Sequence, residues 1–219
     1  MNKLRLRFEK TGRAVYISHL DLMRTMQRAM LRAELPLEYS EGYNPHALIS
    51  ILMPLSVGTA SVCELMDFSL KETVDTDEIP ERLNGVFPEG IRALSAYEPM
   101  RKPKELKWLR ISGELEYDDR DTGKMTDAIG SFFNAPEIFA MKKTKSGEKK
   151  LDIAPGVKQL HIGAAEGRVT VSGIFSAAEP VTNPELLVAA LELGAPELRP
   201  DFHRFIRLET LDTDFEVFR

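Results

Sequence analysis

The chain has 219 residues, of which 43% are hydrophobic and 29% are charged, and its formal net charge is −5 at pH 7. This composition excludes a disordered chain, and the single cysteine, Cys63, excludes a disulfide framework, a four-cysteine zinc site and a self-sufficient iron–sulfur cluster. The longest mainly apolar run, residues 47–57, is too short to cross a bilayer, and the first residues alternate charged and apolar types, unlike a signal peptide. We therefore expect a cytoplasmic globular protein with no membrane span.

The charge is unevenly distributed along the chain. Residues 1–50 carry eight lysines and arginines against five acids, residues 136–160 carry six lysines against three acids, and the remainder is acidic. A mildly acidic protein with two basic patches is suited to bind a polyanion locally rather than to coat nucleic acid.

The first half of the chain predicts six elements. Leu4, Leu6 and Phe8 alternate with charged residues, which indicates a half-buried strand. A helix follows, with Ser18 as its expected N-cap and Pro36 as its stop. The predicted elements are strand 3–10, helix 19–33, strands 47–53 and 63–70, helix 76–87 and strand 91–97. This β-α-β-β-α-β order is typical of a ferredoxin-like split unit.

The second half predicts a similar order after a linker. Residues 99–105 contain two prolines and three basic residues, as linkers do. The elements expected after it are strand 106–117, helix 122–133 with Thr122 as cap, a hairpin of 137–143 and 149–153, strand 168–175, helix 183–193 and strand 203–211. We therefore predict an α+β fold of two tandem ferredoxin-like (split βαβ) units. Residues 1–98 form the first unit, with the main motifs, and residues 106–219 form the second, with a basic hairpin.

The start of the first helix is a candidate anion site. Ser18, His19 and Asp21 lie where a helix presents free N–H groups and the positive end of its dipole. His19 there could contact a phosphate or act as a general acid or base. The alternative is that Ser18 and Asp21 cap the helix and that His19 is an ordinary exposed residue.

Three arginines follow on the same helix. Arg24, Arg28 and Arg32 are spaced by four residues and so share one stripe. With Arg5 and Arg7 they could form one positive surface for phosphate or carboxylate groups, which guanidinium groups bind bidentately. The alternative is a solvated helix face.

Residues 39–46 form a turn that is rich in hydrogen-bonding and aromatic side chains. Tyr43, Asn44 and His46 are candidates for stacking on bases or for hydrogen bonding. A structural turn is the alternative. His19, Asp21, Glu41 and His46 match no known metal-ligand spacing, and no phosphate-binding loop or dinucleotide motif occurs. We therefore expect no metal and no cofactor.

The predicted hairpin in the second half is rich in lysine. Lys142, Lys143, Lys145, Lys149 and Lys150 surround its tip at Ser146-Gly147. A lysine-rich hairpin can clamp RNA through the phosphates, and edge strands also use lysines to prevent aggregation.

Three segments resemble a bacterial family known as the radical-SAM-linked proteins, a domain of unknown function. They are Tyr16-Ile-Ser-His-Leu-Asp-Leu-Met-Arg24, Gly42-Tyr-Asn-Pro45 and Pro54-Leu-Ser-Val-Gly58, and Arg207 in Phe205-Ile-Arg-Leu-Glu209 also fits. The resemblance covers nearly the whole chain and implies a companion of a radical SAM, cobalamin-domain protein. The chain departs from the family where basic residues are common, having Ala47 and Leu48 after Asn-Pro and Ala154 after Asp152-Ile.

We therefore expect a non-catalytic accessory protein that binds RNA or a ribosomal ligand and docks onto a radical SAM partner. Its binding residues are expected near one end of the first unit. They are His19, Asp21, Arg24, Arg28, Tyr43, Asn44 and His46, with Arg207 as an addition.

Two alternative functions stay open. The tandem split units and the early helix with Ser-His-Leu look like the CRISPR-repeat-processing endoribonucleases, which would make the chain a metal-independent nuclease with His19 or His46 as general acid or base. The other alternative is a purely structural protein-docking domain.

Overall fold

The computed structural model describes residues 2–144 and 147–219. The chain is an α+β protein that divides into two compact units. The first unit extends to Glu105 and includes Arg219, and the second comprises Leu106–Phe218. In the described residues, no helix is both long enough and apolar enough to cross a membrane.

The first unit has the element order that its sequence predicts. Its elements are β1 (Asn2–Lys10), the 3-10 turn η1 (Gly12–Tyr16), α1 (His19–Arg32), β2 (Ile49–Ile51), β3 (Ala60–Leu70), α2 (Glu78–Asn84), β4 (Ile91–Tyr97) and the 3-10 turn η2 (Pro103–Glu105). Strand β1 pairs antiparallel with both β4 and β3, and β2 pairs antiparallel with the other edge of β3. Strands β1 and β2 are therefore parallel and are joined by a crossover through α1, as parallel strands require.

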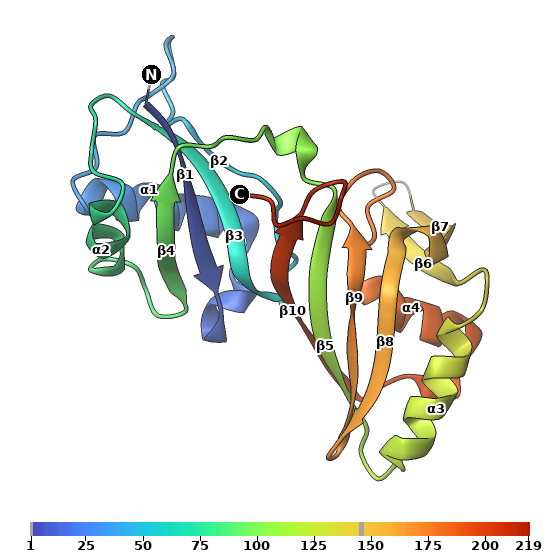
Figure 1. Ribbon diagram of the computed structural model, residues 1–219. Coiled ribbons are helices and arrows are strands. Elements are labelled where there is room, and N and C mark those ends of the chain that lie inside the picture. The colour runs from blue at the N-terminus through green and yellow to red at the C-terminus, as the bar shows by residue number, and fades with distance from the viewer. Residues whose placement is uncertain (1, 145–146) are drawn as a thin grey trace. The chain divides into compact units, whose positions relative to one another are not determined.

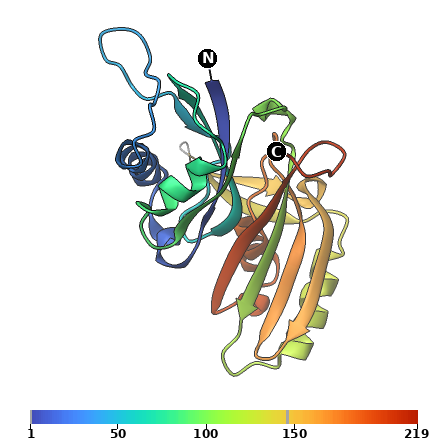
Figure 2. The same ribbon diagram turned by 60° about the vertical axis from the view of Figure 1, so that its left-hand side comes forward.

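The core of the first unit lies between one face of this sheet and the two helices (Figures 1 and 2). Leu6 and Phe8 of β1 are fully buried, as are Met26 and Met30 on the inner stripe of α1. This is the face that the alternating pattern of β1 and the helical spacing of α1 predict, since burial of apolar area is the main favourable term in folding.

The opposite face of β1 carries the odd-numbered residues. Because side chains alternate along a strand, Arg5 and Arg7 point away from the face that α1 covers. They therefore do not join the arginines of α1 in one positive surface, contrary to the sequence-based expectation. The two basic groups lie on different faces of the same sheet.

The second unit is built around a four-stranded antiparallel sheet in the order β10-β5-β9-β8. Helix α3 contacts β8 and β9, and α4 contacts β6. The elements are β5 (Trp108–Glu116), α3 (Thr122–Phe133), β6 (Phe139–Thr144), β7 (Gly147–Asp152), the 3-10 turn η3 (Ala154–Gly156), β8 (Val157–Ala165), β9 (Arg168–Ser176), α4 (Glu185–Gly194), the 3-10 turn η4 (Pro196–Leu198) and β10 (Phe202–Leu211).

Two features of the second unit differ from the sequence-based expectation. The predicted hairpin exists as β6 and β7, but it forms a separate two-stranded sheet. The strand that pairs with the edge of β9 opposite β5 is β8, which was not predicted. Strand β8 has no fully buried side chain because it lies at an edge, so it lacks a clear apolar alternation. The cap of α3 is Asp121 rather than Thr122, since Asp121 Oδ1 accepts hydrogen bonds from the N–H groups of Gly123 and Lys124. Lys145 and Ser146 at the predicted hairpin tip lie outside the described residues.

Candidate functional site

The start of α1 is organised by three side chains one helical turn apart. The Asp21 N–H donates to Ser18 Oγ at 3.2 Å, and the Ser18 hydroxyl lies 2.7 Å from Asp21 Oδ2. Arg24 Nη1 donates to Asp21 Oδ1 at 3.1 Å. The hydrogen bond from Ser18, with a further contribution from Arg24, lowers the pKa of Asp21. Ser18 and Asp21 thus form the predicted cap, and the charge of Arg24 is compensated within the helix.

His19 follows the cap directly and is half-buried. Its Nδ1 atom is buried and makes no hydrogen bond in the described part of the chain. Buried polar atoms normally have a partner, so this nitrogen is one of the exceptions among the described residues.

Two buried residues of opposite charge, Lys10 and Glu64, lie next to the segment that leads into α1. Lys10, 1% exposed, donates from Nζ to the carbonyl oxygens of Val15 at 3.1 Å and Ile17 at 3.4 Å. Burial lowers the pKa of Lys10, and the nearby carboxylate of Glu64, also 1% exposed, opposes that shift. Lys10 therefore ties the end of β1 to the segment that leads into α1.

Two of the three segments that carry the family resemblance meet here. The N–H of Gly58, the last residue of the third segment, donates at 2.9 Å to the carbonyl of Val15, the residue that precedes the first segment. Neither Lys10 nor Glu64 is among the residues that the motifs predict. The signal for Lys10 was present, because it continues the even-numbered series of buried residues Leu4, Leu6 and Phe8 in β1.

The outer face of α1 combines positive and apolar side chains. Arg24, Arg28 and Arg32 are all exposed, and neither Arg28 nor Arg32 forms an ion pair or a side-chain hydrogen bond within the described ranges. Leu20 is 67% exposed and Leu31 is 57% exposed. Spacings of three and four residues bring the exposed side chains of α1 onto one side of the helix, which we call the α1 outer face: Leu20, Arg24, Arg28, Leu31 and Arg32.

Residues 40–46 form a closed loop with an exposed tip. The Ser40 N–H donates to the His46 carbonyl at 2.9 Å, and Ser40 Oγ lies 2.9 Å from His46 Nδ1. Gly42 has a φ of 118°, a left-handed conformation that favours glycine. Tyr43 is fully exposed and Asn44 is exposed beside it. His46 therefore closes the loop, while Tyr43 and Asn44 project from it.

The structure does not bring this loop to the start of α1. The helix begins after the end of β1, whereas Leu37 beyond its C-terminus bridges Leu70, the residue that pairs with Asn2 at the start of β1. A helix of 14 residues spans about 21 Å. The crossover makes this separation necessary, because it must return the chain to the start of β1 before a parallel strand begins. His19 and His46 therefore lie at opposite ends of the first unit.

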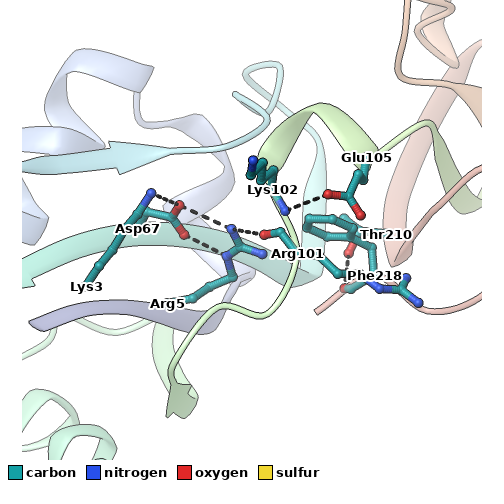
Figure 3. A network of polar contacts seen from close by, with 8 residues as sticks. All are labelled: Lys3, Arg5, Asp67, Arg101, Lys102, Glu105, Thr210 and Phe218. Atoms are coloured by element: carbon teal, nitrogen blue, oxygen red, sulfur yellow. Dashed lines mark hydrogen bonds and ion pairs between the residues drawn. The ribbon is translucent and has the colours of Figure 1, made fainter.

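The face of the first unit that the helices leave uncovered holds a buried ion pair (Figure 3). Arg5 is fully buried and donates to Asp67 from Nε at 2.6 Å and from Nη2 at 3.2 Å, and Nη2 also donates to the Arg101 carbonyl at 3.3 Å. Lys3 Nζ lies 3.2 Å from Asp67 Oδ2. Tyr97 is the cross-strand neighbour of Arg5 on β4, and burial raises the pKa of its hydroxyl.

The remaining basic candidates belong to the second unit. Arg207 is 5% exposed and pairs with Ile111 in the sheet, so it is not on the surface. Lys142 Nζ donates to the Val181 carbonyl at 3.2 Å, and the Lys150 ammonium lies 4.3 Å from the centre of the Phe139 ring. Two of the hairpin lysines are thus held by their own unit. Among the described residues, no cluster of three His, Cys, Asp or Glu side chains could hold a metal ion.

Comparison with known proteins identifies the family. A family model described as "Uncharacterized protein conserved in bacteria (DUF2344)" matches residues 3–184. The chain belongs to the DUF2344 family. The matched range of this DUF2344 protein includes every candidate residue named above except Arg207, which lies beyond it.

The fold of the DUF2344 chain has a counterpart among solved structures. A chain from the "Crystal Structure of a Cbf5-Nop10-Gar1 Complex" matches it with a TM-score of 0.51 and 12% sequence identity. The match covers 94% of the DUF2344 chain and 48% of the other chain, so this protein spans about half the length of that neighbour. At this identity the likeness concerns the fold alone. No curated protein matches the sequence.

Proposed function

We propose that this DUF2344 protein is a non-catalytic accessory protein that binds RNA through the α1 outer face. The observation that carries the proposal is the exposure of Arg28 and Arg32, neither of which has an acidic partner in the described chain. Guanidinium groups bind phosphate oxygens bidentately, and exposed apolar side chains such as Leu20 and Leu31 add contact area for sugars and bases. Because the whole chain has a formal net charge of −5, this positive face attracts phosphate groups only close to it.

The proposal includes a fold and a partner. The strand orders β4-β1-β3-β2 and β10-β5-β9-β8, each with two helices, support a pair of ferredoxin-like units, with β6 and β7 as an insertion in the second. A radical SAM protein is the partner that the motif resemblance suggests. In support, Gly58 of the third motif segment bonds Val15, the residue before the first segment, and the buried Lys10 donates to the Ile17 carbonyl within that first segment.

The test is RNA binding by matched variants of the full chain. The probe is a short fluorescein-labelled single-stranded RNA, measured by fluorescence anisotropy at several salt concentrations. The R28A/R32A variant should bind more weakly, and its slope of log K against log salt should be shallower by about 0.7 for each phosphate that the variant no longer neutralises. The control is R92A/K104A, which removes two exposed charges elsewhere in the first unit. Equal affinities for the wild type and R28A/R32A would reject the proposal.

One observation favours the nuclease as a second candidate. His19 is half-buried at a helix start, which attracts anions, and its imidazole could act there as a general acid or base. Because His46 lies at the other end of the unit, the reaction would depend on His19 alone. RNA cleavage in the presence of a chelator that is lost in H19A and kept in H46A would favour the nuclease. If the wild type and both variants leave the RNA intact, the nuclease is rejected and the non-catalytic accessory role is kept.

A purification from native cytoplasm, with and without nuclease, tests the partner. Co-purification of a radical SAM protein together with a discrete RNA would support both parts of the proposal. Co-purification of that protein without RNA would favour the protein-docking domain, and the α1 outer face would then be a protein interface.

A further inference from the structure

The outer edge of strand β8 pairs with no other strand in the described part of the chain. Strand β8 ends the sheet order β10-β5-β9-β8, and Figures 1 and 2 both show it at the end of the row of strands. Helix α3 contacts both β8 and β9, so it packs on a face of the sheet rather than along this edge. The edge therefore presents backbone N–H and C=O groups to which a further strand can bind.

The hairpin that joins β8 to β9 shows which backbone groups point outward. Only two residues separate Ala165 from its partner Arg168, so these two form a hydrogen-bonded pair that exchanges both N–H···O bonds. Hydrogen-bonded and non-hydrogen-bonded pairs alternate along an antiparallel ladder, so the backbone groups of Gly163 and His161 also point to β9. The alternate residues have their N–H and C=O groups on the outer edge: Leu160, Ile162 and Ala164.

This edge lacks the features that normally keep edge strands from pairing. Residues 160–165 contain no lysine, arginine, acidic residue or proline. A bulge precedes them, where the register shifts between Lys158 and His161 and Gln159 has a φ of 50°. The β6–β7 hairpin of the same unit, by contrast, carries lysines on both strands: Lys142, Lys143, Lys149 and Lys150. Because charged side chains, prolines and bulges block the pairing of edges, residues 160–165 are an edge that is open to pairing.

The open stretch is complementary to itself. When two copies are placed antiparallel about a two-fold axis at Ile162, this residue faces its own copy, and Leu160 of each copy faces Ala164 of the other. All three residues have outward backbone groups, so each of these pairs exchanges two backbone hydrogen bonds. An axis one residue to either side would place one of the three residues opposite the turn or the bulge. The axis at Ile162 is therefore the one that pairs all of them.

The side chains fit this register. Leu160 of one copy lies beside Ala164 of the other on one face, and His161 lies beside Gly163 on the opposite face, so that a large side chain meets a small one each time. Leu160 and Ile162 are half-buried on the face that α3 covers. Pairing removes more of their apolar surface from water, which is favourable.

The charges next to the stretch favour the same arrangement. Lys158 precedes the stretch and Glu166 follows it, and both are exposed. In an antiparallel pair the start of one strand lies beside the end of the other, so the lysine of each copy comes to the same end as the glutamate of the other copy. Opposite charges brought together in this way are complementary.

We propose that β8 pairs antiparallel with β8 of a second copy of this chain, so that the four-stranded sheets of two copies join into one. Each copy uses the same surface, so the contact is closed by its two-fold axis and stops at a dimer. The contact lies in the second unit and does not rest on RNA binding by the α1 outer face.

Sedimentation of the full-length protein at a series of concentrations tests for the dimer. The wild type should form a dimer as its concentration rises. Ala164→Pro removes an outward N–H group from each copy, leaves the bonds to β9 in place, and should weaken the dimer by about tenfold or more. The matched control Ala164→Thr keeps the N–H group and should dimerise as the wild type does. Circular dichroism verifies that both variants keep the fold.

Cysteine trapping tests the register in a chain whose backbone is unchanged. Residues that form a hydrogen-bonded pair have Cα atoms about 5.5 Å apart, within the reach of a disulfide, so Ile162→Cys should form a disulfide-linked dimer in oxidised glutathione. In the same dimer His161 lies diagonal to its own copy, about 7–8 Å away, so His161→Cys should react far more slowly although this position is more exposed. The natural Cys63 is buried and gives a low background.

The outcomes separate the proposal from its alternatives. A monomer at every concentration would overturn the proposal and leave the edge to a strand of another protein. A dimer that Ala164→Pro does not weaken, or equal trapping of Ile162→Cys and His161→Cys, would place the contact elsewhere and also overturn it. A series of ever larger species would show unspecific association of edges. R28A/R32A should dimerise as the wild type does, so a failure of RNA binding and a failure of the dimer are distinguishable.

Discussion

The two units of this protein use similar sets of helices and strands but place their ion pairs differently. In the first unit, Arg5 and Asp67 are buried in the sheet, and Lys10 and Glu64 are buried below the start of α1. In the second unit, the carboxylate of Glu114 binds Arg204 and Arg168 at the surface. Burying charges is costly and needs accurate hydrogen bonding, whereas surface pairs contribute little. These two buried pairs of opposite charge thus occur in the unit that holds the three resemblance segments, while the second unit buries the charged side chain of Arg207, which is 5% exposed.

The largest expected effect tests this difference directly. Asp67→Ala removes the carboxylate shared by Arg5 and Lys3 and leaves a fully buried guanidinium without its counter-charge, which should cost about 3–5 kcal/mol of unfolding free energy. Glu114→Ala in the second unit should cost less than about 1 kcal/mol, because its partners are exposed and can be solvated. Urea denaturation of both variants measures the contrast. Losses of equal size would show that burial does not distinguish the two units.

The second comparison concerns alkaline pH. Lys10 has a pKa in the folded chain that lies below its ordinary value of 10.5. Between the folded-state pKa and 10.5 the unfolded chain binds more protons than the folded chain, so the free energy of unfolding increases as the pH rises. Tyr117 of the second unit has its pKa raised by burial from 10.0 to about 12, so between these values the folded chain binds more protons and stability falls as pH rises.

Difference measurements isolate the two contributions. The stability of the wild type relative to Lys10→Met should increase with pH up to about 10.5, and relative to Tyr117→Phe it should decrease above pH 10. Urea titrations at a series of pH values provide both curves. Slopes of the same sign for the two variants would contradict the assigned environments.

The smallest expected effect compares two helix caps. Ser18→Ala and Asp121→Ala each remove the side-chain acceptor at a helix start and should each cost about 1 kcal/mol. If the α1 outer face binds RNA, Ser18→Ala should also weaken RNA binding by loosening Asp21 and Arg24, whereas Asp121→Ala should not. Anisotropy and urea denaturation on the same samples separate the two roles. An equal loss of RNA affinity in both variants would show a general effect of stability.

Local patterns predicted much of the first unit and less of the second. The alternation of Leu4, Leu6 and Phe8 and the spacing of Leu22, Met26 and Met30 depend on contacts with one buried face, so period and burial agree. Strand β8 was not predicted because an edge strand buries few side chains and therefore lacks a clear apolar alternation. The hairpin has a clear turn signal, but that signal does not show which sheet its strands join.

The sequence by itself determined the order of elements in the first unit, the cap at Ser18, the row of arginines on α1 and membership of a bacterial family whose model matches most of the chain. Only the tertiary structure decided that His19 and His46 lie at opposite ends of the unit, that Arg5 and Arg7 lie on the face away from α1, and that Lys10 is buried. The physical reason is that periodicity shows which residues share a face of one element. The distance between faces and ends depends on how the crossover and the strand pairing return the chain, which no local pattern records.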